Sequence, residues 1–213
     1  MTDIDFTGPG RDCPFCPRLV AFRQQHRATH PDWHNAPVPS FGGDARLLIV
    51  GLAPGLKGAN RTGRPFTGDY AGDLLYATLL KFGLAEGTYR QSADDGLRLK
   101  GVRITTAVRC VPPENKPETS EIKQCRPFLI AELAALGRLQ AILALGQLAH
   151  TQVLATLGLR QAAYKFAHEA RHTLANGLVL ADSYHCSRYN TNTGRLTTEM
   201  FEAVFRGLMP VLG

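Results

Sequence analysis

The stretch ARLLIVG at residues 45–51 determines how the rest of the chain is interpreted. It is a continuous apolar run that ends in glycine, which is typical of a strand buried on both faces of a parallel sheet. Three comparable runs follow it: VRITTAV at 102–108, LQAILALG at 139–146 and GLVLADSYH at 177–185. Together these runs predict a four-stranded sheet.

Segments with helical spacing of apolar residues separate or flank these runs. We expect helices at 18–27, 72–82, from 119 or 120 to 137, at 147–157 and at 197–208. Strands that alternate with helices favour a mainly parallel sheet with helices on both faces. The predicted fold class is therefore α/β.

The composition of the 213-residue chain fits one folded domain, because 44% of its residues are hydrophobic. The chain has no apolar run long enough to cross a bilayer and no signal-peptide pattern. We therefore expect a cytoplasmic monomer without a membrane partner. The net charge of +6 favours a polyanionic partner, although many basic proteins bind no nucleic acid.

The five cysteines indicate a metal ion or a cluster. An odd number of cysteines in a chain of intracellular type argues against a disulfide framework. Cys13 and Cys16 form a close pair, and Cys110 and Cys125 lie far away in the sequence. Four thiolates can close a zinc site or hold an iron–sulfur cluster, and the spacing does not distinguish the two.

Three polar loops follow predicted strands, at 51–73, 107–117 and 185–197. In parallel sheets ligands bind beyond the carboxyl ends of the strands, so we expect these loops to form one site. The first loop is rich in glycine, but it has neither Walker A nor dinucleotide-binding spacing. Its backbone N–H groups are suited to an anion or a polar base edge.

Side chains of the first loop have more than one interpretation. Phe66 can stack on a base or plug the loop onto the core. Asp69 can position a water or cap the helix that follows. Asn60 offers both a donor and an acceptor.

His185 ends the last predicted strand. It can donate a hydrogen bond to an oxygen that gains negative charge, or serve as a structural hydrogen-bonding group. Cys186 points to the opposite face of the strand and is expected to be a bystander. The residues that follow supply phosphate contacts and a wedge for a base stack: Ser187, Arg188, Tyr189 and Asn190.

Two motifs resemble those of a known family. GLAPGLKGANRTGRPFTGD followed by HCSRYNTNTGRLT resembles the site motifs of type 5 uracil-DNA glycosylases, family B of the prokaryotic iron–sulfur group. The cysteine layout resembles the same group, and the resemblance spans nearly the whole chain. It implies a three-layer α/β/α sandwich that hydrolyses the N-glycosidic bond of uracil in DNA, as a monofunctional glycosylase of base excision repair.

The resemblance also implies a [4Fe–4S] cluster, with zinc as the alternative. The implied ligands are Cys13, Cys16, Cys110 and Cys125. The cluster would play a structural part and tie the N-terminal segment 1–40 to the single domain 1–213.

Residue roles follow from the same resemblance. Ala53 stands where type 4 relatives have an acidic residue, so Asp69 is the expected substitute that orients water together with Asn60. His185 would stabilise the departing base. The expected base contacts are Leu52, Ala53, Phe66, Thr106 and Asn190, and the expected DNA contacts are Arg61, Arg64, Ser187, Arg188, Tyr189 and Arg195.

Two positions depart from the family pattern. Thr106 stands where relatives often have asparagine, and Cys186 stands where proline is expected. Weaker reading of the base edge by Thr106 would relax the discrimination between bases. Three alternatives stay open. They are a glycosylase mainly for hypoxanthine or xanthine, a non-catalytic iron–sulfur protein that binds damaged or single-stranded DNA, and a zinc-stabilised nucleotide-binding protein.

Overall fold

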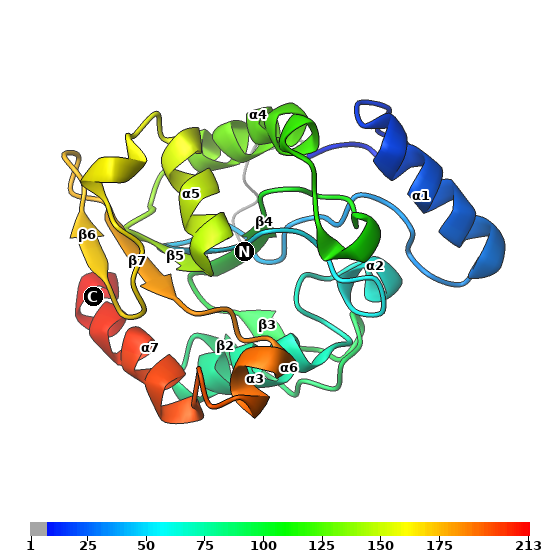
Figure 1. Cartoon of the computed structure of the whole chain (residues 1–213). Helices are drawn as coiled ribbons and strands as arrows, with labels where there is room; N and C mark the ends of the chain where they lie inside the picture. Colours follow the sequence, from blue (N-terminus) through cyan, green and yellow to red (C-terminus); the bar gives the residue numbers. More distant parts are fainter. Residues whose placement is uncertain (1–7) are drawn as a thin grey trace.

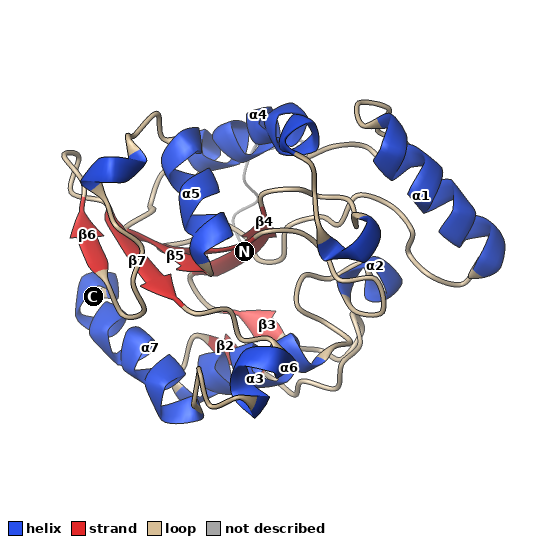
Figure 2. Ribbon diagram, in the orientation of Figure 1, coloured by secondary structure: helices blue, strands red, loops and turns tan. Residues whose placement is uncertain are grey.

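A computed structural model describes residues 8–213, and residues 1–7 of the predicted N-terminal segment lie outside them. Its central sheet has the strand order β4-β1-β5-β7-β6 (Figures 1 and 2). The parallel strands are β4 (Val102–Thr106), β1 (Leu47–Gly51), β5 (Ala141–Leu145) and β7 (Val179–Ser183). The edge strand β6 (Arg171–Thr173) runs antiparallel to β7.

Helices cover both faces of the sheet, which gives three layers (Figure 2). On one face lie α3 (Tyr70–Lys81) and α7 (Thr198–Leu212), and on the other lie α4 (Thr119–Ala135) and α5 (Gln147–Thr156). β1 shows why its sequence suits this position. Leu47 and Ile49 pack in the core under α3 and α7, whereas the intervening Leu48 packs in the core under α4 and α5.

The α/β prediction is confirmed, but the predicted number of strands is wrong. The sheet has five strands, because β6 adds a short edge strand. Its side chains are exposed or partly exposed, so it lacks the apolar run that marks the other strands. The prediction also missed the hairpin of β2 (Ala85–Glu86) and β3 (Arg98–Leu99), and the short helices α2 (Ala59–Thr62), η1 (Pro113–Asn115), η2 (Gln161–Ala163) and α6 (Arg188–Asn192).

Helix α1 (Pro17–Thr29) lies outside the three layers, at one end of the molecule (Figure 1). Leu19 anchors it in a small apolar cluster with Val108 and Cys125. Arg18 forms a two-armed contact with Glu121 of α4, at 2.8 and 2.7 Å. No helix within residues 8–213 is both long and apolar enough to cross a bilayer.

Candidate functional site

The three polar loops meet around a cavity of about 640 Å³, here called the loop cavity. It lies at the carboxyl ends of β1 and β4 and beside the residues that follow β7. Its volume is in the range of sites for small molecules. The side chains around it include Leu52, Ala53, Phe66, Asp69, Thr106, Asn115, His185, Ser187 and Arg188. The expected convergence of the loops is confirmed.

Phe66 is both a core residue and a wall of the loop cavity. It is 8% exposed, and its backbone has a φ of 51°. Its ring packs so closely on β1 that a Cβ at Gly51 would lie 2.8 Å from the ring. The ring of His185 lies 5.9 Å away, centroid to centroid. The two interpretations of Phe66 are therefore compatible, because its ring packs against β1 and also lines the cavity.

Asp69 precedes α3 at the capping position, yet its side chain makes no capping hydrogen bond. Within residues 8–213, its buried Oδ1 atom has no hydrogen-bond partner. Its Oδ2 atom lies against the glycine-rich loop, where a Cβ at Gly58 would be only 2.1 Å from it. Burial raises the pKa of Asp69, and the nearby amides of Gly72 and Ala71 partly offset this effect. The Asp69 side chain also lines the loop cavity, so its carboxyl group lies beside the space that a water molecule there would occupy.

His185 lines the loop cavity, two residues after the end of β7. Burial lowers the pKa of its imidazole, so the ring is neutral at physiological pH. The Asn190 side chain donates to the backbone carbonyl of His185 at 2.8 Å. Asn190 is not among the residues that line the cavity, so the structure gives it a contact to the His185 backbone instead of a contact to a base.

Thr106, the last residue of β4, and Asn115, in the segment that follows this strand, bring polar groups to the cavity. The Thr106 hydroxyl donates to the carbonyl of Val108 at 2.9 Å, which leaves its lone pairs free to accept. Asn115 is the only carboxamide in the described lining, and it has a φ of 57°. The sequence marked its loop as part of the site but gave no sign that this residue would reach the cavity.

Two predicted site residues take part in other contacts. Asn60 is 1% exposed and its amide donates to Asn35 at 2.9 Å, so it braces the N-terminal segment and is not in the cavity lining. Arg64 is 4% exposed, and its two terminal nitrogens bind Asp95 at 2.8 and 2.7 Å. The prediction that Arg64 contacts DNA is wrong, because its charge is buried and already paired.

Among the remaining predicted DNA contacts, Ser187 and Arg188 line the cavity, and the side chains of Arg61, Arg188, Tyr189 and Arg195 are exposed. The exposed Arg61 holds the first loop by donating to the carbonyls of Lys57 and Gly68. The Arg188 guanidinium lies 5.5 Å from the centre of the Tyr70 ring, at the cavity. Tyr189, the next residue, is 71% exposed. The exposed Arg195 lies later in the same segment, with its guanidinium 4.7 Å from the centre of the Tyr184 ring.

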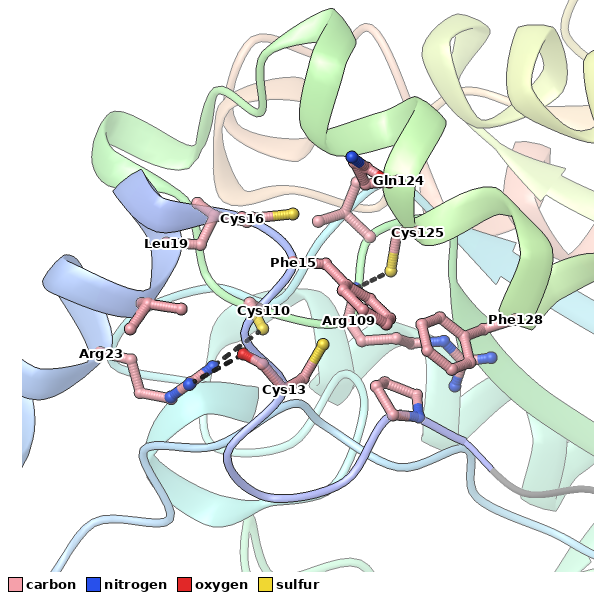
Figure 3. A pocket seen from close by; sticks show the side chains of 13 residues that line it. Cys13, Phe15, Cys16, Leu19, Arg23, Arg109, Cys110, Gln124, Cys125 and Phe128 are labelled. Atoms are coloured by element: carbon pink, nitrogen blue, oxygen red, sulfur yellow. Dashed lines mark hydrogen bonds between the residues drawn. The ribbon is translucent and has the colours of Figure 1, made fainter.

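Four cysteines surround a second cavity, here called the cysteine cavity (Figure 3). Cys13 and Cys16 precede α1, Cys110 follows β4, and Cys125 lies on α4. Phe15 and Phe128 stack beside it, with ring centroids 6.2 Å apart. Within residues 8–213, no three cysteine, histidine or acidic side chains are placed to hold a single metal ion.

The donor set of the cysteine cavity fits an iron–sulfur cluster. All four side chains are thiols, the ligands that such clusters require. Burial raises the pKa of Cys16 to about 11 and that of Cys110 to about 12, so the thiolates need a cationic core to form. One of these sulfur atoms accepts a hydrogen bond from the backbone: the Arg109 amide donates to Cys125 Sγ at 3.3 Å. The fully buried Cys186 lies apart from this set and is not in the lining.

The chain is similar in sequence to known uracil-DNA glycosylases. A family model described as the uracil DNA glycosylase superfamily matches residues 39–209. A type-5 uracil-DNA glycosylase from Thermus thermophilus is 48% identical over 196 residues, which cover 89% of each chain. One from Pyrobaculum aerophilum is 42% identical over 207 residues, covering 95% of this chain and 90% of that protein. A type-4 enzyme from the same organism is 34% identical over 54% of this chain.

Proposed function

The chain belongs to the uracil-DNA glycosylase superfamily, and from this premise we propose that it hydrolyses the N-glycosidic bond of uracil in DNA. The resemblance inferred from its motifs is confirmed. Cleavage of this bond initiates base excision repair. The observation that carries the proposal is the meeting of Phe66, Asp69 and His185 around one cavity.

Access to the bond requires the nucleotide to leave the base stack, which costs a few kcal/mol and least at a mispair. Arg188 and the exposed Tyr189 are the side chains that fill the gap in the stack. Arg61, Ser187 and Arg195 contact the flanking phosphates. The net charge of +6 favours this encounter with DNA.

The extruded base enters the loop cavity. Phe66 stacks on its face, and the backbone amides of Leu52 and Ala53 meet its polar edge. Thr106 accepts a hydrogen bond from a ring N–H, since its own proton is directed at Val108. Asn115 offers both a donor and an acceptor at the rim.

Bond cleavage leaves an anionic base and a cationic sugar. Neutral His185 donates a hydrogen bond to the base oxygen that gains charge, in a cavity partly shielded from water. Asp69, whose side chain lines the cavity, orients the water that captures the sugar. Asn190 acts one step away, by holding the backbone of His185.

The substrate range extends to other deaminated bases, with hypoxanthine and xanthine as the candidates. The cavity of about 640 Å³ has room for a purine. A Thr106 hydroxyl that only accepts can serve the N–H of uracil and the ring N–H of either purine alike. It therefore discriminates less than an asparagine would.

We expect abasic sites when the iron-containing protein is incubated with duplexes that each carry one uracil, hypoxanthine or xanthine. Alkaline cleavage at the modified position is the measurement, and duplexes with normal bases are the control. Binding to uracil-containing DNA without any abasic product would reject the enzyme proposal in favour of a non-catalytic binding protein. Cleavage of uracil alone would reject the broader substrate range.

The pH profile should report the carboxylate of Asp69. Because burial raises its pKa above the usual 3.8, protonation should abolish water orientation at a higher pH than for an exposed aspartate. The rate should therefore fall as pH decreases through this raised pKa. Protonation of His185 at low pH would leave its N–H hydrogen-bond donor in place. We therefore assign the loss of rate at low pH to protonation of Asp69.

The test is the single-turnover rate of uracil release against pH. Asp69→Asn should be slower than wild type at neutral pH, by less than the loss for His185→Ala, and should lack the acid limb. An unchanged acid limb in Asp69→Asn would assign the titration to another group.

We also propose that the cysteine cavity holds a [4Fe–4S] cluster. The cluster contributes rigid cross-links between α1, the loop after β4 and α4, and no chemical step of base removal passes through it. The four thiols that surround the cavity support this role.

A further inference from the structure

Arg23 is a buried cation at the cysteine cavity. It lies on α1, is 3% exposed and lines the cavity together with the four cysteines. One terminal nitrogen donates to Cys110 Sγ at 3.6 Å and the other to the carbonyl of Cys13 at 3.1 Å (Figure 3). Its Nε atom is also buried and has no hydrogen-bond partner within residues 8–213.

Arg23 forms no salt bridge among the described residues, and the nearby carboxylate of Asp12 is bonded to Arg27 instead. Its neighbours on α1 differ in this respect, since Arg18 pairs with Glu121 at 2.7 Å and Arg27 with Asp12 at 2.6 Å. A buried guanidinium without an anion is costly, because desolvation of the charge is not repaid. A negative group inside the cysteine cavity would therefore offset the desolvation cost of the Arg23 guanidinium.

We propose that Arg23 is the counter-charge of the cysteine cavity and donates hydrogen bonds to its sulfur. The inference rests on the cluster proposed above. Four thiolates outweigh the positive charge of an iron–sulfide core, so a bound cluster is the negative group that Arg23 lacks. Hydrogen bonds to ligand sulfur strengthen metal retention, as outer-shell partners do in other metal sites.

The test compares iron loss from three purified variants with wild type under anaerobic conditions, using an iron chelator in excess. Arg23→Gln should release iron about 10-fold faster or more, the usual scale for an outer-shell partner. Arg23→Lys, which keeps the charge, should fall between Arg23→Gln and wild type. Arg18→Gln is the matched control, because it removes an α1 tether to α4 without touching sulfur.

Iron–sulfur stretching frequencies, measured by resonance Raman, separate the proposed role from a purely structural one. Loss of the bond to Cys110 should shift these bands in Arg23→Gln and leave them unchanged in Arg18→Gln. Equal iron release from Arg23→Gln and Arg18→Gln, with unshifted bands in both, would overturn the role of Arg23. Wild-type protein without iron and sulfide would instead refute the cluster proposal itself.

Discussion

Replacing His185 with alanine should slow uracil release from duplex DNA by roughly 10²-fold or more, which is the scale for loss of one key donor to a developing anion. Burial keeps the imidazole neutral, so its N–H is available when the base departs. The donor acts on charge that develops in the transition state, and substrate binding should therefore change much less than the rate.

The measurement is the single-turnover rate with a duplex that carries one uracil, together with binding of a non-cleavable analogue. His30→Ala is the matched control, because His30 lies on the C-terminal side of α1 and is not in the lining of the loop cavity. A near-normal rate for His185→Ala would remove this residue from the mechanism.

Replacing Cys110 with alanine should yield a protein without iron and lower its melting temperature by roughly 10 °C or more. Cluster cross-links join α1 to the loop after β4 and to α4, so their loss removes several kcal/mol, and in a domain of this size about 1 kcal/mol shifts Tm by 2–4 °C. The same loop carries Asn115 at the cavity rim, so the rate of uracil release should fall as well.

Iron content, absorbance near ~400 nm from thiolate-bound iron and thermal unfolding measure this effect. Cys186→Ala provides the control, since Cys186 is buried but does not line the cysteine cavity. That variant should retain its iron. A Cys110→Ala protein with full iron content would show that Cys110 is not a ligand.

The positions of the main strands and the meeting of the polar loops could be predicted, because long apolar runs mark buried parallel strands. The strand ends and the loops that follow them then place Phe66, Thr106 and His185 at one edge of the sheet. β6 could not be predicted in this way. Its three residues are exposed or partly exposed and carry no apolar periodicity, so only their pairing with β7 makes them a strand.

Individual side-chain roles were harder to predict, because they depend on tertiary partners. Arg61 and Arg64 lie three residues apart in the segment after β1, yet Arg64 is buried in an ion pair with Asp95 while Arg61 is exposed. Asn115 lies at the loop cavity because Glu114 and Asn115 adopt left-handed backbone conformations after two prolines. No local sequence pattern predicted this turn. The role of Arg23 could not be predicted either, because it depends on a contact with Cys110 that only the folded chain makes.

A structure of the protein bound to a duplex with a non-cleavable 2′-fluoro-deoxyuridine would examine the loop cavity most directly. The uracil ring should lie outside the helix and inside this cavity, stacked on Phe66, with one of its oxygens within hydrogen-bonding distance of His185. A uracil that stays in the base stack, or that occupies another part of the surface, would contradict the assignment of the cavity as the place where the bond is cleaved.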